Sequence, residues 1–139
     1  MKTRQDIPVF LLRITLAVGF LSAVASRLGF WGAQSSGWKN FVSYTAEVNS
    51  FFPSSWAPIL AALSTATELS LGILLIFGYQ IRKAALAASV LIFLFGIAMS
   101  ISFGCKEALD YSVFVFSAGA FLLSTFPCYI WSLDQFSHQ

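Results

Sequence analysis

Four long apolar runs constrain this chain more than any other feature. They extend over Ile7–Leu28, Pro58–Tyr79, Ala84–Phe103 and Tyr111–Pro127. A helix needs about 20 mostly apolar residues to cross a hydrocarbon core roughly 30 Å thick, so each run is predicted to span a membrane. Charged residues make up 10% of the chain, against about 25% in a typical soluble domain. We therefore expect residues 1–139 to form a single transmembrane domain.

The four runs are predicted to be helices that pack together. Lipid offers backbone groups no hydrogen-bond partners, so a span must satisfy its own, as a helix does. The runs do not alternate in polarity as the strands of a membrane β-barrel would. Each run also carries a stripe of small residues, which permits close helix contact in lipid. The fold class is therefore predicted to be all-α, an integral membrane four-helix bundle.

The amino-terminal run has an alternative interpretation as a signal peptide. Lys2 and Arg4 precede an apolar stretch, and Ala23-Val24-Ala25 imitates a cleavage site. Arg13 falls inside what would be the apolar core of such a peptide, where a charge is unfavourable. We expect this run to be retained as the first span.

The positive charges near the span ends predict the orientation. If both termini are cytoplasmic, the inner side carries Lys2, Arg4, Arg82 and Lys83, and the outer side carries Arg27, Lys39 and Lys106. The inner charges lie in short flanks, where the rule is strongest. We therefore predict a multi-pass membrane protein with both termini in the cytoplasm.

The long connection between the first two runs is predicted to contain an amphipathic helix. Within Trp38–Phe52, apolar residues recur at helical spacing, and the aromatic members include Trp38, Phe41 and Tyr44. One interpretation is an interfacial helix whose aromatic face anchors it in the headgroup region. The other is a lid over a cavity that lipid can reach.

Glu68 is the most informative single residue. It lies about ten residues from either end of the second run, so it would sit roughly 15 Å deep in the membrane. A charge at that depth costs about 2.5–3.5 kcal/mol on insertion scales. Glu68 should therefore face the bundle interior, together with Ser64 on the same helical face, and be either paired or protonated.

Two arginines could pair with Glu68. Because helical side chains lean toward their own amino terminus, Arg13 would lean toward the cytoplasmic surface and reach the headgroups. Arg27 would lean back toward the level of Glu68, with Asp110 as a second acceptor. These charges either lock the helix register or form a proton path or a site for a polar ligand.

Several other kinds of chemistry are not expected. His138 is the only histidine, so the chain cannot assemble a four-ligand nitrogen and sulfur metal site, and haem ligation is equally unsupported. Cys105 and Cys128 do not form a C-x-x-C motif. The net charge of +2 is scattered, which gives no indication of nucleic-acid binding. We predict no metal and no intrinsic cofactor.

The chain resembles the DoxX family of small four-helix membrane proteins. The first run and its arginines are similar to the family's opening span, and Thr67-Glu68-Leu69 with Arg82-Lys83 resembles its glutamate span and basic turn. The most specific match is Lys106 followed by Leu109–Phe114, which contains Asp110 and Tyr111. Many members have lysine where this chain has Arg27, a change that keeps the charge but alters the donor geometry.

The resemblance implies a protein of the cell inner membrane that serves as an accessory subunit of a quinone-linked or thiol-linked oxidoreductase. The family takes its name from an archaeal quinone-reducing thiosulfate oxidoreductase. On this basis Arg13, Glu68 and Asp110 are candidate functional positions, and a quinone or a lipid is the candidate ligand. The expected partners are the bilayer and other membrane or periplasmic redox subunits, or further copies of the chain.

Two other functions stay open at this point. The chain could be a non-catalytic scaffold, or a module that binds lipid or a partner. The other alternative is a small transporter, although four spans without broken helices or repeats offer little for alternating access.

Overall fold

The computed structural model describes residues 4–137, and every regular element in that range is helical. The α-helices are α1 (Asp6–Arg27), α2 (Trp38–Val48), α3 (Ala57–Phe77), α4 (Ile81–Phe103), α5 (Cys105–Asp110), α6 (Val113–Ser124) and α7 (Leu133–Ser137). Two short 3-10 turns, Gly32–Gln34 and Ser54–Trp56, flank α2. The predictions that involve Lys2 and His138 lie outside the described residues.

Three helical segments are long and apolar enough to cross a membrane. They are Asp6–Arg27, Ser54–Phe77 and Ile81–Phe103. The prediction of an all-α membrane protein is confirmed, and the amphipathic helix between the first two spans is present as α2. That helix ends at Val48, before the Phe52 to which the sequence pattern extends.

The predicted fourth span is shorter than expected. In place of one helix over residues 111–127, α5 ends at Asp110, Ser112 adopts a left-handed conformation with φ of 56°, and α6 begins at Val113. The 12 residues of α6 rise about 18 Å, less than the roughly 30 Å of a hydrocarbon core. The count of four membrane-crossing helices is therefore not confirmed.

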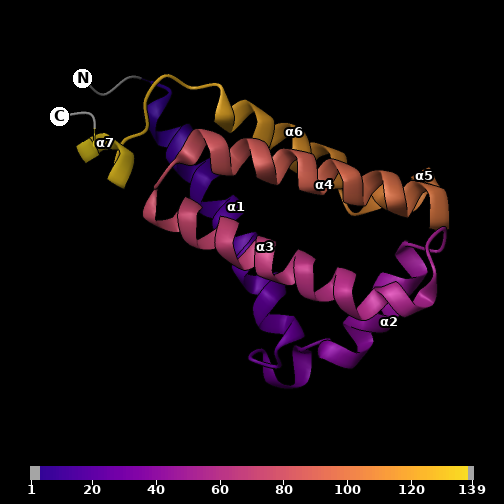
Figure 1. Ribbon diagram of the computed structural model, residues 1–139. Helices are drawn as coiled ribbons and strands as arrows, with labels where there is room; N and C mark the ends of the chain where they lie inside the picture. The colour runs from indigo at the N-terminus through magenta and orange to yellow at the C-terminus, as the bar shows by residue number, and fades with distance from the viewer. Residues whose placement is uncertain (1–3, 138–139) are drawn as a thin grey trace.

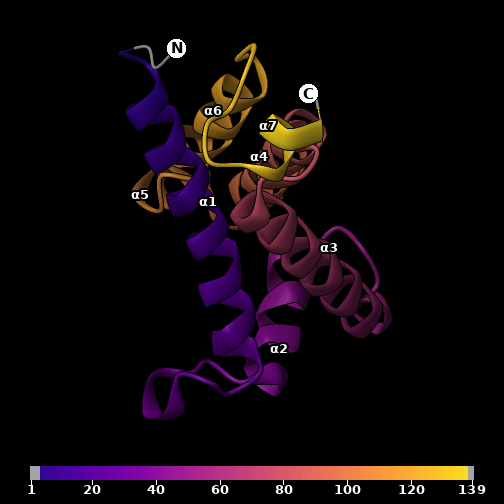
Figure 2. The same ribbon diagram turned by 90° about the vertical axis from the view of Figure 1, so that its left-hand side faces the viewer.

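Helices α4 and α6 lie side by side and run in opposite directions (Figures 1 and 2). Ser89 Oγ donates to the backbone oxygen of Ser117 at 2.9 Å, and Ser117 Oγ donates to that of Ser89 at 2.8 Å. Gly96 faces Val113 and Phe114, and a methyl group on Gly96 would come within 3.0 Å of both side chains. Small residues thus bring these two helices together, as the sequence predicts.

Helices α3 and α4 diverge from the turn that joins them (Figure 1). Gly78 ends α3 in a left-handed conformation. The Asp134 carboxylate accepts hydrogen bonds from the backbone N–H groups of Gln80 (2.7 Å) and Ile81 (2.8 Å), which caps the amino end of α4. Helix α2 lies across the wide end, where Ser102 Oγ donates to the backbone oxygen of Val48.

Arg13 is buried, so the expectation that its side chain would extend to the lipid headgroups is wrong. Its side chain is 1% exposed and donates to the backbone oxygens of Ile130 (3.3 Å) and Trp131 (2.7 Å). The Phe10 ring packs edge-on against Trp131. The chain after α6 folds back over the first half of α1 and supplies the acceptors, so Arg13 stays buried instead of extending to the surface.

Candidate functional site

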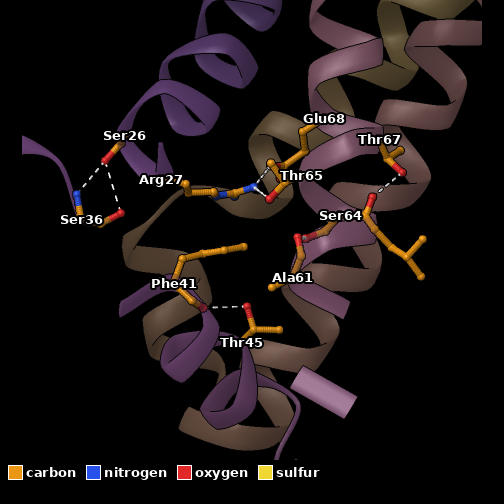
Figure 3. Close-up of polar contacts among 11 residues, drawn as sticks. Ser26, Arg27, Ser36, Phe41, Thr45, Ala61, Ser64, Thr65, Thr67 and Glu68 are labelled. Atoms are coloured by element: carbon orange, nitrogen blue, oxygen red, sulfur yellow. Dashed lines mark hydrogen bonds and ion pairs between the residues drawn. The ribbon is translucent and has the colours of Figure 1, made fainter. Parts of the chain in front are cut away.

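Arg27 and Glu68 form an ion pair in the interior of the helix assembly (Figure 3). Arg27 is the last residue of α1, and Glu68 lies near the middle of α3. Their side chains are 12% and 18% exposed. The same Nη1 atom of Arg27 also donates to Thr65 Oγ1 at 3.1 Å. Glu68 therefore faces inward and pairs with Arg27 rather than Arg13, as predicted.

A third helix holds the arginine from its other side. The Arg27 guanidinium lies 3.7 Å from the centre of the Phe41 ring on α2. A cation over an aromatic face is attracted by the ring quadrupole, and the attraction grows when water is excluded. Arg27 is thus fixed by α2 and α3 while it extends from the end of α1.

The return of the chain after α1 brings α2 into this position. Ser36 N–H donates to Ser26 Oγ at 3.0 Å (Figure 3). Gly37 N–H donates to the Ser26 backbone oxygen at 3.2 Å. Gly37 has a φ of 79°, in the left-handed region that favours glycine. The turn at Gly37 therefore directs α2 back beneath the end of α1.

The ion pair forms part of the wall of a cavity of about 290 Å³ between the diverging helices. Its polar members are Arg27, Glu68, Ser64, Thr45 and Asn49. The other lining residues are apolar: Phe41, Leu60, Leu91, Ile92, Leu94, Phe95 and Ala98. A pocket with a largely apolar wall and a few polar groups at one place is typical of a small-molecule site.

Helix α2 turns its aromatic residues toward the protein rather than away from it. Phe41 lines the cavity, and the Tyr44 ring stacks on Phe103 with a centroid distance of 6.1 Å and approaches Phe95. Burial raises the pKa of the Tyr44 phenol above its ordinary value. Trp38 is partly exposed beside Phe41. Of the two sequence interpretations, the contacts of Phe41 and Tyr44 match a helix that covers a cavity, and the placement of α2 in the headgroup region stays a prediction.

The remaining predicted site residues lie elsewhere. Asp110 pairs with Lys106 at 2.6 Å, so the expectation that it would be a second acceptor for Arg27 is wrong. Tyr111 is exposed and lines a separate cavity with Asp110. Arg13 lies against the C-terminal segment, and the structure brings together only Arg27, Ser64 and Glu68 with the covering helix.

Sequence reasoning missed several contributors to the site. Thr65 is not among the predicted site residues, yet its hydroxyl accepts a hydrogen bond from Arg27. Asn49, which follows α2, is not among the predicted site residues either, and it lines the cavity. The α4 wall carried no sequence signal, because its apolar residues resemble those of any span. Among the described residues, no group of three or more side chains could hold a metal ion.

Comparison with known proteins supports one assignment. A family model described as DoxX matches residues 9–101, which include most of α1, all of α2 and α3, most of α4 and both members of the ion pair. No curated protein and no solved structure matches the chain significantly.

Proposed function

The chain belongs to the DoxX family, and from that premise we propose that it is an accessory membrane subunit that holds a quinone beside the Arg27–Glu68 pair. The partner would be a quinone-linked or thiol-linked oxidoreductase of the inner membrane. The observation that carries this proposal is the position of the ion pair in the wall of a mainly apolar cavity.

The donors of Arg27 suit the head of a quinone. Among residues 4–137, its Nη1 atom bonds to Glu68 and Thr65, and its Nε and Nη2 atoms make no hydrogen bond. A guanidinium carries five N–H donors and no acceptor, so donors remain for a carbonyl oxygen of the ligand. Glu68 stabilises the positive charge of Arg27 without occupying all of its donors.

The apolar walls of the cavity suit the apolar tail of a quinone. Leu91, Leu94, Phe95 and Ala98 form the α4 side of the cavity, and Leu94 is largely exposed. A ligand that enters from the lipid between α3 and α4 would thus keep its apolar part against α4. An amphiphile with a hydrogen-bonding ring and an apolar tail has this distribution of polarity.

Binding is better supported than proton transfer. A proton path needs a series of titratable groups, whereas the only hydrogen-bond partner of Glu68 among the described residues is Arg27. Asp110, the other candidate acid, bonds to Lys106. We therefore assign redox chemistry and proton uptake to the partner subunit and ligand retention to this chain.

The proposed orientation places both termini in the cytoplasm. The first half of α1 and the segment around Trp131 lie against each other, which puts the two ends of the described chain on one side of the molecule (Figure 1). This arrangement requires an even number of crossings, with the short α6 as the fourth.

Filling the cavity tests the proposal directly. We expect the protein in nanodiscs to bind a short-chain ubiquinone analogue saturably, with quenching of tryptophan fluorescence as the readout. Ser64→Leu places a larger side chain in the cavity and should weaken binding at least tenfold. Ser70→Leu is the matched control, because Ser70 is exposed on the same helix and bonds only within it. Equal affinities for the two variants would contradict the proposal.

A module that binds lipid or a protein partner is the second candidate. Phe30 and Trp31 stand exposed in the loop after α1, where they could contact a bilayer or another chain. Loss of partner association on Phe30→Ser, with quinone binding unaffected by Ser64→Leu, would favour this function. A small transporter receives the least support, since α1, α3 and α4 are continuous helices.

A further inference from the structure

A second cavity lies at the opposite end of the α3–α4 pair. It has a volume of about 680 Å³ and is lined by the α3–α4 turn, the chain after α6 and α7. Its charged lining residues are Arg82, Lys83 and Asp134, and its uncharged ones are Tyr79, Gln80, Pro127, Cys128, Tyr129, Gln135 and Ser137. We propose that this pocket binds the headgroup of an anionic phospholipid.

The charges of the pocket are arranged to receive an anion at Lys83. Both carboxylate oxygens of Asp134 accept backbone N–H groups at the start of α4, so this acid is already engaged. The Arg82 guanidinium donates to the backbone oxygens of Phe126 (3.0 Å) and Pro127 (3.4 Å). Among residues 4–137, Lys83 has no hydrogen-bond or ion-pair partner, so its ammonium group is available to a ligand.

The contacts of Arg82 hold the pocket open. They attach the chain after α6 to the start of α4, and Tyr129 adds a hydrogen bond of 2.6 Å from its hydroxyl to the Leu123 backbone oxygen. Burial raises the pKa of the Tyr129 phenol above its ordinary value. The positive charge of Arg82 remains beside Lys83 while its donors serve the fold.

An apolar stripe on α4 leads away from Lys83 and distinguishes a lipid from a soluble anion. Residues three or four apart lie on one helical face, and the exposed side chains that continue from Lys83 are Leu86, Val90, Leu94 and Ile97. Acyl chains could follow this stripe while the headgroup stays at the cations. Tyr79 and Trp131 are half-exposed at the same end of the molecule, as aromatic residues at a membrane surface commonly are.

The headgroup is inferred to carry a net negative charge. Basic residues near an anionic leaflet attract its lipids, and each such residue strengthens binding about fivefold. A zwitterionic headgroup would gain little from Lys83, because its own cation would lie beside the ammonium group. A free phosphate ion would share the charge but gain nothing from the apolar stripe.

Thermal unfolding of the intact chain in a neutral detergent tests this assignment. We expect phosphatidylglycerol to raise the midpoint temperature in a saturable manner, whereas phosphatidylcholine and inorganic phosphate at equal concentration leave it unchanged. Lys83→Gln should weaken the phosphatidylglycerol response about fivefold, since it removes one cation without breaking a contact in the fold. Lys39→Gln is the matched control, because Lys39 is an exposed cation of α2 without a partner among the described residues.

Three results would overturn the proposal: an equal response to phosphatidylcholine, an equal shift with inorganic phosphate, or an unchanged phosphatidylglycerol affinity in Lys83→Gln. The test is independent of the quinone proposal. Ser64→Leu, which fills the other cavity, should keep the full response to phosphatidylglycerol.

Discussion

Arg27 and Glu68 pair across 41 residues of sequence, and the pair joins the end of one helix to the middle of another. Helix α1 crosses α3 obliquely instead of running parallel to it (Figure 1). Space remains beyond the end of α1, which α2 and the diverging α3 and α4 enclose as a cavity. The ion pair thus joins two helices and supplies charge to a cavity whose other walls are largely apolar.

Neutralising the pair should reveal strong coupling between its members. Arg27→Gln leaves the Glu68 carboxylate without its cation, and breaking a buried pair in this way costs about 3–5 kcal/mol. Arg27→Gln combined with Glu68→Gln should cost less than the sum of the single changes, because no charge is left uncompensated. The coupling free energy is obtained from the unfolding free energies, measured in detergent, of the unchanged protein, the two single variants and the double variant. Strictly additive effects would contradict the paired geometry.

Removing the Arg13 guanidinium should release the C-terminal segment. Arg13→Met keeps most of the side-chain length and loses the donors to Ile130 and Trp131, each worth about 1.5–3 kcal/mol for a charged group. Amide hydrogen exchange at residues 130–137 should accelerate while α3 and α4 stay protected. Arg4→Met, a change at an exposed arginine, should leave the exchange unchanged. Unaltered protection in Arg13→Met would refute this role.

The glycines at helix contacts should differ sharply in their tolerance of a methyl group. On Gly96 it would lie 3.0 Å from Val113 and Phe114, and on Gly72 it would lie 2.9 Å from Leu21. Gly96→Ala and Gly72→Ala should each lower stability by about 1–3 kcal/mol through overpacking. Gly119→Ala is the control, since its methyl group would meet Leu12 at 3.5 Å, an ordinary contact. If all three variants unfold at the same temperature, the close helix contacts are wrong.

The two cysteines allow a direct test of the proposed orientation. Cys105 begins α5, Cys128 follows α6, and both are exposed and free. With Cys128→Ser, an impermeant maleimide should label Cys105 on intact cells from which any outer membrane has been stripped. With Cys105→Ser, Cys128 should be labelled only after the membrane is permeabilised. Labelling of both from one side would mean that α6 does not cross.

The sequence predicted the parts of the fold that depend on apolar run length and residue size. The first three spans, the small-residue contacts at Ser89 and Ser117, and the partner of Glu68 all follow from local patterns. The lean of helical side chains toward the amino terminus favours Arg27 over Arg13 as the partner. Few groups inside a hydrocarbon core can pair with the Glu68 carboxylate, so few alternative partners were possible.

The same reasoning failed where a distant backbone supplied the partner. The acceptors of Arg13 are carbonyl groups more than 100 residues away, and nothing in local spacing predicts that the chain after α6 folds back to them. Asp110 was assigned to Arg27 although Lys106, one helical turn away, was the nearer cation. The left-handed conformation of Ser112 was not predicted, because glycine and asparagine, rather than serine, are typical of such positions.

Photoaffinity labelling with an azido-quinone in nanodiscs is the most direct test of the Arg27–Glu68 cavity as a ligand site. The label should map by mass spectrometry to peptides that contain Phe41, Ser64 and Phe95, and an excess of unlabelled quinone should compete with it. Labelling that is spread over the lipid-facing side chains of α3, such as Ile59 and Leu63, without competition would contradict the assignment.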